Sequence, residues 1–158
     1  MYRFKSGKLA GMTMQHAILK RGARLYGIAT WAEANVETNP RFRKLVKEFY
    51  RLKNLLSYAR IKVRCKESEC TKPARWMTFE ATYQGYLPLP DLWCDKHGPP
   101  EEWGVSERIR LGLEAMELFK TLSERKIVHR EILQAWGICK GTRITEAFAN
   151  HFFDALGR

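Results

Sequence analysis

The sequence predicts a mainly α-helical protein in which helical N-terminal and C-terminal segments are joined by a β-hairpin. Apolar residues recur at three- and four-residue steps before residue 64 and after residue 101, as they do along amphipathic helices. Between these stretches the composition changes to Pro, Gly, Cys and aromatic residues, and three Cys and one His flank the region of strand composition. We therefore expect a basic helical segment (1–64), a metal-binding hairpin module (65–100) and a three-helix segment (101–158).

The clearest helical pattern covers roughly residues 40–62. Asn39 and Pro40 form a start signal, with Asn39 as the N-cap and Pro40 at the first helical position. The apolar stripe is Phe42, Leu45, Phe49, Leu52, Leu56 and Ala59. On a helical wheel the opposite side carries a basic cluster, Arg43, Lys44, Lys47 and Arg51. One side of this helix is therefore expected to pack, and the other to present positive charge.

The remaining helices are predicted from capping residues and apolar spacing. Thr13 can cap a first helix, although Gly22 and Gly27 lower its intrinsic stability by about 1 kcal/mol each. We expect Ser106 to cap a helix that runs to about residue 125, followed by a short helix over 128–136 and a third that starts at Thr142. These last helices resemble a helix-turn-helix only weakly, because their charge is balanced and the turn is long. We interpret them as a packing module.

The middle segment has the composition of a two-stranded hairpin. Residues 76–83 and 86–93 are rich in aromatic and β-favouring residues, and Gln84 with Gly85 offers a turn. Pro88 and Pro90 cannot donate ladder hydrogen bonds, so the second strand is expected to be an edge strand or an irregular one.

A metal site is predicted at the base of this hairpin. Cys65 and Cys70 form a Cys-x4-Cys pair, and Cys94 with His97 forms Cys-x2-His after a gap of twenty-three residues. Three thiolates and one imidazole suit Zn²⁺, and four protein ligands leave no open position, so the zinc would be structural. The alternatives are ordinary buried cysteines or disulfides, and disulfides are disfavoured in a reducing compartment. The fourth cysteine, Cys139, has no partner in this spacing and is expected to be buried.

Over some 35 residues this layout resembles the knuckles of zinc ribbons and treble clefs. The resemblance implies a fold element of that kind. It implies no function, because such knuckles serve nucleic-acid, protein and purely structural roles alike.

The net charge of +11 is concentrated near the N-terminus. Residues 1–64 hold fifteen basic and three acidic side chains, whereas residues 101–158 hold nine of each. A first basic cluster, Lys20, Arg21 and Arg24, precedes the one within 40–62. Such a one-sided field is typical of proteins that bind the phosphate backbone of DNA or RNA. Aromatic residues interleave with the basic ones and could stack on bases: Tyr26, Trp31, Tyr50 and Tyr58.

The sequence therefore favours a non-enzymatic nucleic-acid-binding protein with a structural zinc site, working within a larger assembly with protein partners. The alternative is an interaction module or inhibitor that binds an acidic protein surface of a nucleic-acid-processing complex. We find no Gly-rich phosphate loop, no pair of carboxylates at metal-site spacing and, outside the predicted metal ligands, no nucleophile close to a histidine in the sequence. No sequence motif therefore indicates catalysis. The longest uncharged stretches, 9–19 and 25–32, are too short to span a bilayer, so we expect no membrane association and a cytoplasmic or nucleoid location. An organelle transit peptide remains an alternative, because no acidic residue precedes Glu33.

Overall fold

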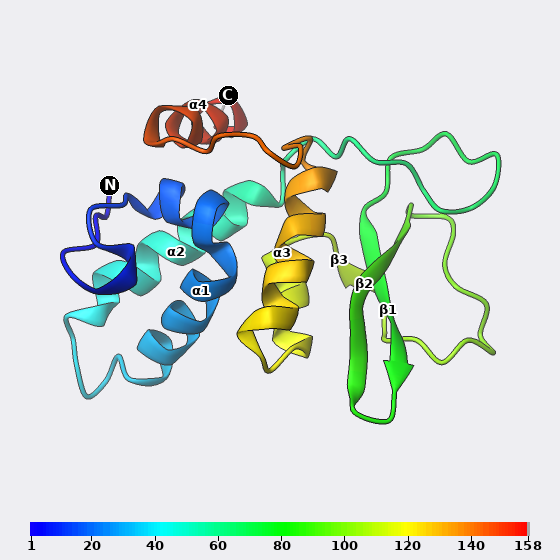
Figure 1. Cartoon of the computed structure of the whole chain (residues 1–158), viewed down its shortest axis with the longest axis horizontal. Helices are drawn as coiled ribbons and strands as arrows, with labels where there is room; N and C mark the ends of the chain where they lie inside the picture. Colours follow the sequence, from blue (N-terminus) through cyan, green and yellow to red (C-terminus); the bar gives the residue numbers. More distant parts are fainter. Residues whose placement is uncertain (158) are drawn as a thin grey trace. The chain divides into compact units, whose positions relative to one another are not determined.

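The computed structural model describes residues 1–157 and contains helices together with one small antiparallel sheet (Figure 1). The chain folds into two compact units. The helical unit comprises Met1–Ala59 and the chain from Arg143 onward, and the hairpin unit comprises Arg60–Thr142. This division differs from the three expected segments, since the last helix belongs with the N-terminal helices.

The helical unit is built from a short 3-10 helix η1 (Gly7–Leu9) and the helices α1 (Met14–Ala34), α2 (Phe42–Leu56) and α4 (Glu146–Leu156). Thr13 is confirmed as the N-cap of α1, where its hydroxyl accepts a hydrogen bond from the His16 amide at 3.3 Å. The helices α1 and α2 run antiparallel. The Tyr26 ring meets that of Phe49, near the middle of α2, at 6.1 Å, while Trp31 meets Phe42, at the start of α2, at 5.0 Å.

The apolar stripe of the strongest predicted helix is confirmed, since Leu45, Phe49, Leu52 and Leu56 are all buried in α2. Its predicted ends are wrong. The helix starts at Phe42 because the Asn39 side chain accepts from the Arg41 amide and forms a turn before the helix. It stops at Leu56 rather than at residue 62, and the chain beyond Ala59 already belongs to the other unit.

The hairpin unit contains strands β1 (Trp76–Thr82), β2 (Gly85–Trp93) and β3 (Ile109–Arg110), then the 3-10 helix η2 (Leu113–Leu118) and helix α3 (Leu122–Ala135). The strand order is β2-β1-β3, with both pairs antiparallel. The predicted hairpin is therefore confirmed, and the proline-containing strand β2 does lie at the sheet edge. Phe79 of β1 is fully buried and meets Phe119, which follows η2, edge to face at 5.0 Å.

The expected helix from Ser106 is wrong. Ser106 is buried, its hydroxyl accepts from the Phe79 amide at 2.9 Å, and its own amide donates to the Phe79 carbonyl at 2.7 Å. Residues 104–111 thus provide hydrogen-bond partners for the backbone groups on the second edge of β1. To do so they must be extended rather than helical. Helix α3 starts later, where Thr121 and Glu124 form a capping box.

The expected three-helix C-terminal segment is wrong for the same reason. Only α3 and α4 follow the sheet as α-helices in the described part of the chain. They belong to different compact units, unlike the paired helices of a helix-turn-helix. Helix α4 begins at Glu146 with Thr145 rather than Thr142 as its N-cap.

Two glycines with positive φ follow the end of helix α3 at Ala135. Gly137 has φ of +82°, and a Cβ there would lie 2.8 Å from Lys62 Cγ. Gly141 has φ of +91°, with nothing within 4 Å of such a Cβ. We expect Gly137→Ala to cost about 2 kcal/mol and Gly141→Ala about 1 kcal/mol of unfolding free energy, because only the first adds a close contact to left-handed strain. Urea unfolding of both variants measures the difference; equal losses would show that the Lys62 contact is irrelevant.

Candidate metal centre and basic surface

Four side chains converge beside the first residue of β1 and the last residue of β2. The potential ligand atoms of Cys65, Cys70, Cys94 and His97 all lie within 4.8 Å of one another. Cys94 directly follows Trp93, the last residue of β2, which pairs with Trp76 at the start of β1. The hairpin therefore returns the chain to its starting point and brings the second ligand pair beside the first.

The spacing of these atoms matches a tetrahedral site. The sulfurs of Cys70 and Cys94 are 3.9 Å apart, and His97 Nδ1 lies 3.6 Å from the sulfurs of both Cys65 and Cys94. A tetrahedral Zn²⁺ with ordinary bond lengths would place two sulfurs about 3.8 Å apart and a sulfur and a nitrogen about 3.5 Å apart. The four predicted ligands are thus together and could hold a metal ion through Nδ1 of His97.

Backbone amides support negative charge on these sulfurs. The pKa of the Cys94 thiol is lowered: burial acts to raise it, but hydrogen bonds from the Lys96 and His97 amides and from the neighbouring thiols outweigh burial. The hydrogen bond from the Lys72 amide is the largest single influence on the Cys70 thiol and lowers its pKa, but desolvation and the neighbouring thiols together leave that pKa raised. The cluster is therefore better suited to several thiolates when a cation neutralises their repulsion.

Packing around the cluster is tight and partly aromatic. Cys65 and Cys94 are buried with Trp93, and the indole of Trp76 packs against them. Arg108 donates to the Cys94 carbonyl at 3.0 Å while its guanidinium lies over the Trp76 ring. These contacts fix the second ligand pair from outside the ligand set, as supporting residues do around metal sites.

Two ion pairs lie near the cluster. Lys66 Nζ pairs with the Asp91 carboxylate at 2.6 Å and lies over the Trp103 ring. Asp95 accepts from the Trp76 indole at 3.0 Å and faces Arg75 at 3.6 Å.

Cys139, expected to be buried, is instead exposed, because it lies in the turn after α3. It is not part of the cluster.

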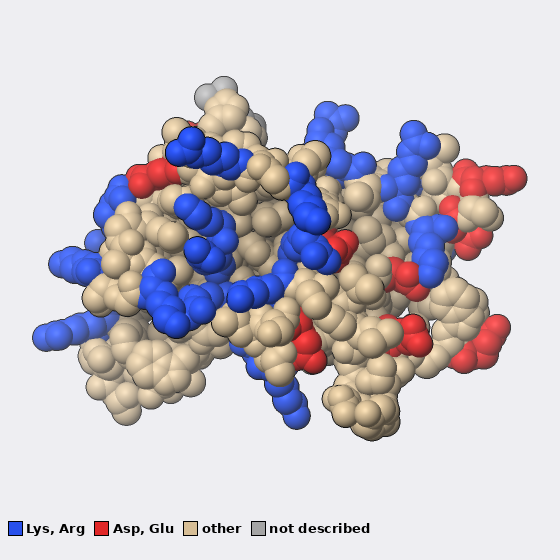
Figure 2. All heavy atoms as spheres, viewed as in Figure 1, with Lys and Arg blue, Asp and Glu red and all other residues tan. Residues whose placement is uncertain are grey.

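The helical unit carries most of the net positive charge. From its start to Ala59 and from Arg143 onward, the sequence has fourteen basic and five acidic residues, a net charge of +9. The other unit has fourteen basic and twelve acidic residues, a net charge of +2. In Figure 2 blue side chains spread over the face of the helical unit that is in view, with few red ones between them.

Six of the seven predicted phosphate-binding residues form what we name the basic surface, on α1 and α2. They are Lys20, Arg21, Arg24, Arg43, Lys44 and Lys47. Arg24 is half-buried and the other five are exposed. No carboxylate within residues 1–157 forms an ion pair with any of the six. Arg21 has non-helical φ and ψ of −138° and 27°, so α1 kinks beneath the first cluster.

The seventh residue, Arg51, is held differently. Its Nε and Nη2 donate to the two oxygens of Glu48 at 2.9 and 3.1 Å, as in a bidentate pair. This pair lowers the pKa of Glu48, chiefly through the hydrogen bond from Arg51. Much of the charge of Arg51 is thus already compensated.

The predicted aromatic residues divide into two kinds. Tyr26 is only 2% exposed and packs on Phe49, so the expectation that it could stack on a base is wrong. Tyr50 is half-buried and donates its hydroxyl hydrogen to Glu33. Trp31 and Tyr58 are 57% and 77% exposed. Trp31 touches Phe42, which precedes Arg43 and Lys44 of the basic surface.

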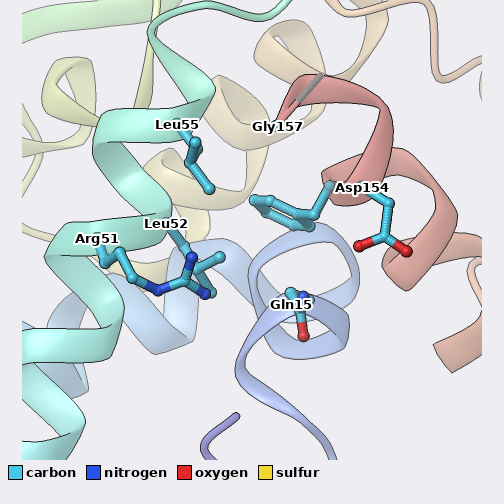
Figure 3. Close-up of a pocket in the computed structure, with 7 residues that line it drawn as sticks. Gln15, Arg51, Leu52, Leu55, Asp154 and Gly157 are labelled. Carbon is cyan, nitrogen blue, oxygen red and sulfur yellow. The ribbon is translucent and has the colours of Figure 1, made fainter.

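Sequence reasoning missed a pocket of about 440 Å³ in the helical unit (Figure 3). It is lined by residues from all three α-helices of that unit, among them Gln15, Arg51 and Asp154. Gln15 and Asp154 are far apart in sequence and belong to no motif. Their proximity follows only from the packing of α4 with α1 and α2.

Comparison of the chain with known protein families, with curated proteins and with solved structures gives no match. Within residues 1–157, no helix is both long enough and apolar enough to cross a bilayer.

Proposed function

We propose that this is a non-enzymatic nucleic-acid-binding protein whose hairpin unit is held together by one structural Zn²⁺. The zinc proposal rests on the donor set and on the near-tetrahedral distances among Cys65, Cys70, Cys94 and His97. Four protein ligands close the coordination shell, which leaves no position for an activated water. We propose that the two short ligand pairs form knuckles of the zinc-ribbon or treble-clef kind.

The binding proposal rests on one observation: none of the six cations of the basic surface pairs with a carboxylate of residues 1–157. Surface helices ordinarily mix charge signs and gain stability from oppositely charged residues three or four positions apart. Here the cations repel one another, and their like charge favours an acidic partner. A phosphate backbone provides regularly spaced negative charge and releases condensed counterions when cations replace them.

Exposed aromatic residues favour a nucleic acid over an acidic protein as the partner that we propose. Trp31 packs against Phe42, which directly precedes the cationic residues of α2. More than half of the Trp31 side chain is exposed. An indole next to a phosphate-binding surface suits an unpaired base, because stacking on aromatic side chains contributes about 1–3 kcal/mol per base. We therefore propose single-stranded DNA or RNA as the preferred partner, with protein subunits of a larger assembly bound elsewhere.

Salt dependence of binding tests this proposal. Six phosphate contacts on a single strand predict that log K falls against log salt concentration with a slope of about −4. Fluorescence polarisation of the full chain with labelled single-stranded DNA, duplex DNA and polyglutamate would measure it. We expect the single strand to bind most tightly and polyglutamate to displace it poorly. Tight polyglutamate binding with no preference for nucleic acid would favour an acidic protein partner, and absence of salt-dependent binding would refute both.

A further inference from the structure

The β-hairpin carries a row of exposed apolar side chains. Leu87 and Leu89 are both exposed and are alternate residues of β2, so they project from the same side of the strand. Tyr83, in the turn between the strands, is 95% exposed. In Figure 2 the protruding end of the hairpin is accordingly an uncharged, tan surface. Apolar side chains gathered in this way are typical of surfaces that contact another protein.

Trp103 extends this row from outside the hairpin. Its ring meets that of Trp93 at 6.5 Å, and Trp93 projects from the same side of β2 as Leu89, four residues earlier. The carbonyl of the next residue, Gly104, accepts from the Ala81 amide of β1 and keeps the loop beside the sheet. Trp103 remains exposed over 43% of its surface. We name these four residues the hairpin surface: Tyr83, Leu87, Leu89 and Trp103.

The charge around the hairpin surface is negative, in contrast to the rest of the protein. Residues 76–107 contain six acidic side chains and one basic side chain, a net charge of −5, whereas the whole chain has a net charge of +11. Glu80, Glu101 and Glu102 are exposed, and no lysine or arginine of residues 1–157 forms an ion pair with them. The hairpin surface therefore suits a partner that is positively charged and also exposes apolar side chains.

The free edge of β2 is poorly suited to backbone pairing with such a partner. Phe79 directs its N–H and its carbonyl to Ser106, so the backbone of Pro90, which lies opposite Phe79, faces the free edge. Proline has no N–H to donate there, and the Leu92 carbonyl already accepts from the Lys66 amide at 2.7 Å. Addition of a further strand is therefore disfavoured, and a partner would contact side chains.

A second copy of this chain offers a partner of the required kind. Its helical unit has a net charge of +9, and none of the six cations of the basic surface pairs with a carboxylate of residues 1–157. Trp31 packs against Phe42 at the start of α2 and adds exposed apolar area beside these cations. The protein thus carries two surfaces of opposite charge, each with exposed aromatic residues.

We propose that the hairpin surface of one copy docks on the basic surface of a second copy. This inference goes beyond the proposed function. The contact joins two different surfaces, so a dimer retains one free surface of each kind, and association continues beyond the dimer unless a ring closes. Nucleic acid is proposed to bind the same basic surface, so it competes with self-association.

Complementation between two variants tests this inference. Leu87→Thr with Leu89→Thr removes apolar area at two exposed positions without a change of charge, and threonine is well accepted in strands. Lys20→Glu with Lys47→Glu alters the basic surface. In sedimentation equilibrium the mass of the parent protein should rise with protein concentration and fall with added salt. Each variant alone should associate about tenfold more weakly. Their equimolar mixture should recover parental affinity and stop at the dimer, because one intact pair of surfaces remains.

Two controls separate this contact from other kinds of association. Lys126→Glu with Lys140→Glu has the same net charge as the basic-surface variant and should associate like the parent; an equal loss would overturn the inference. Excess single-stranded DNA should dissociate the parental assembly, whereas bound DNA that leaves the assembly intact would overturn it.

Three further results would overturn the inference. A parent protein that is monomeric at every concentration would do so and would leave a separate cationic protein as the occupant of the hairpin surface. Normal association of the basic-surface variant would indicate pairing between two hairpins instead. A mixture of the two variants that stays monomeric would show that the two surfaces do not meet. None of these results affects the proposed function, which depends on the binding of single strands to the isolated chain.

Discussion

Cys94→Ser is expected to abolish cooperative folding of the hairpin unit. The variant loses a thiol of the proposed zinc site; Cys94 is 2% exposed and lies among Trp93, Cys65 and Trp76. The apparent binding free energy of a structural Zn²⁺ is on the order of 10 kcal/mol, which is comparable to the entire stability of a small domain. Tryptophan fluorescence reports the loss, because four of the five tryptophans lie between residues 60 and 142.

Cys139→Ser is the matched control for this prediction. It makes the same chemical change at an exposed cysteine outside the cluster. We expect this variant to retain one zinc per chain by elemental analysis and to unfold like the parent protein. Chelator treatment of the parent should reproduce the Cys94→Ser phenotype. Folded parent protein without zinc, or a Cys94→Ser variant with unchanged melting, would refute the structural zinc.

Acidification should weaken the proposed zinc site. Cys94, whose thiol pKa is lowered, must be deprotonated to bind zinc, as must the other two cysteines, and His97 must bind through a neutral ring nitrogen. Protons therefore compete with zinc, and the zinc-dependent part of the stability is lost as pH falls. Zinc release measured with a chromogenic chelator as pH is lowered would follow this competition.

The sequence predicted the features that depend on residues close to one another along the chain. The ligand pairs at Cys65/Cys70 and Cys94/His97 are short, and the strand composition between them predicted a hairpin that brings the pairs together. The apolar stripe of α2 was predictable because apolar residues at a regular 3.6-residue period lie on one face of a helix, and that face is the one that is buried. These signals need no knowledge of which distant segment packs against them.

The features that the sequence did not predict depend on contacts between segments that are distant along the chain. The apolar spacing of Ile109, Leu113 and Met116 suits a helix, yet residues 104–111 are extended because β1 needs a second hydrogen-bonding partner. Gly112 separates that strand from η2. The pocket at Gln15 was equally invisible, since its lining depends on α4 packing in the helical unit.

Charge reversal on the basic surface is expected to cause the largest loss of nucleic-acid affinity. Lys20→Glu combined with Lys47→Glu changes one exposed residue on α1 and one on α2. Loss of two single-strand phosphate contacts should lower affinity on the order of twentyfold near 0.1 M salt and reduce the salt slope by about 1.4. The fold should survive, because both side chains are exposed and glutamate has good helix propensity.

Lys126→Glu combined with Lys140→Glu is the charge-matched control in the hairpin unit. Both of these lysines are exposed, and the net charge of the protein changes equally in the two double variants. If a local phosphate-binding surface governs affinity, the control should lose less than threefold, because long-range charge is screened over about 10 Å at this salt concentration. Equal losses in both variants would mean that overall charge governs binding. A greater loss in the control would place the nucleic acid on the hairpin unit. An acidic protein would then be the better explanation for the cations of the basic surface.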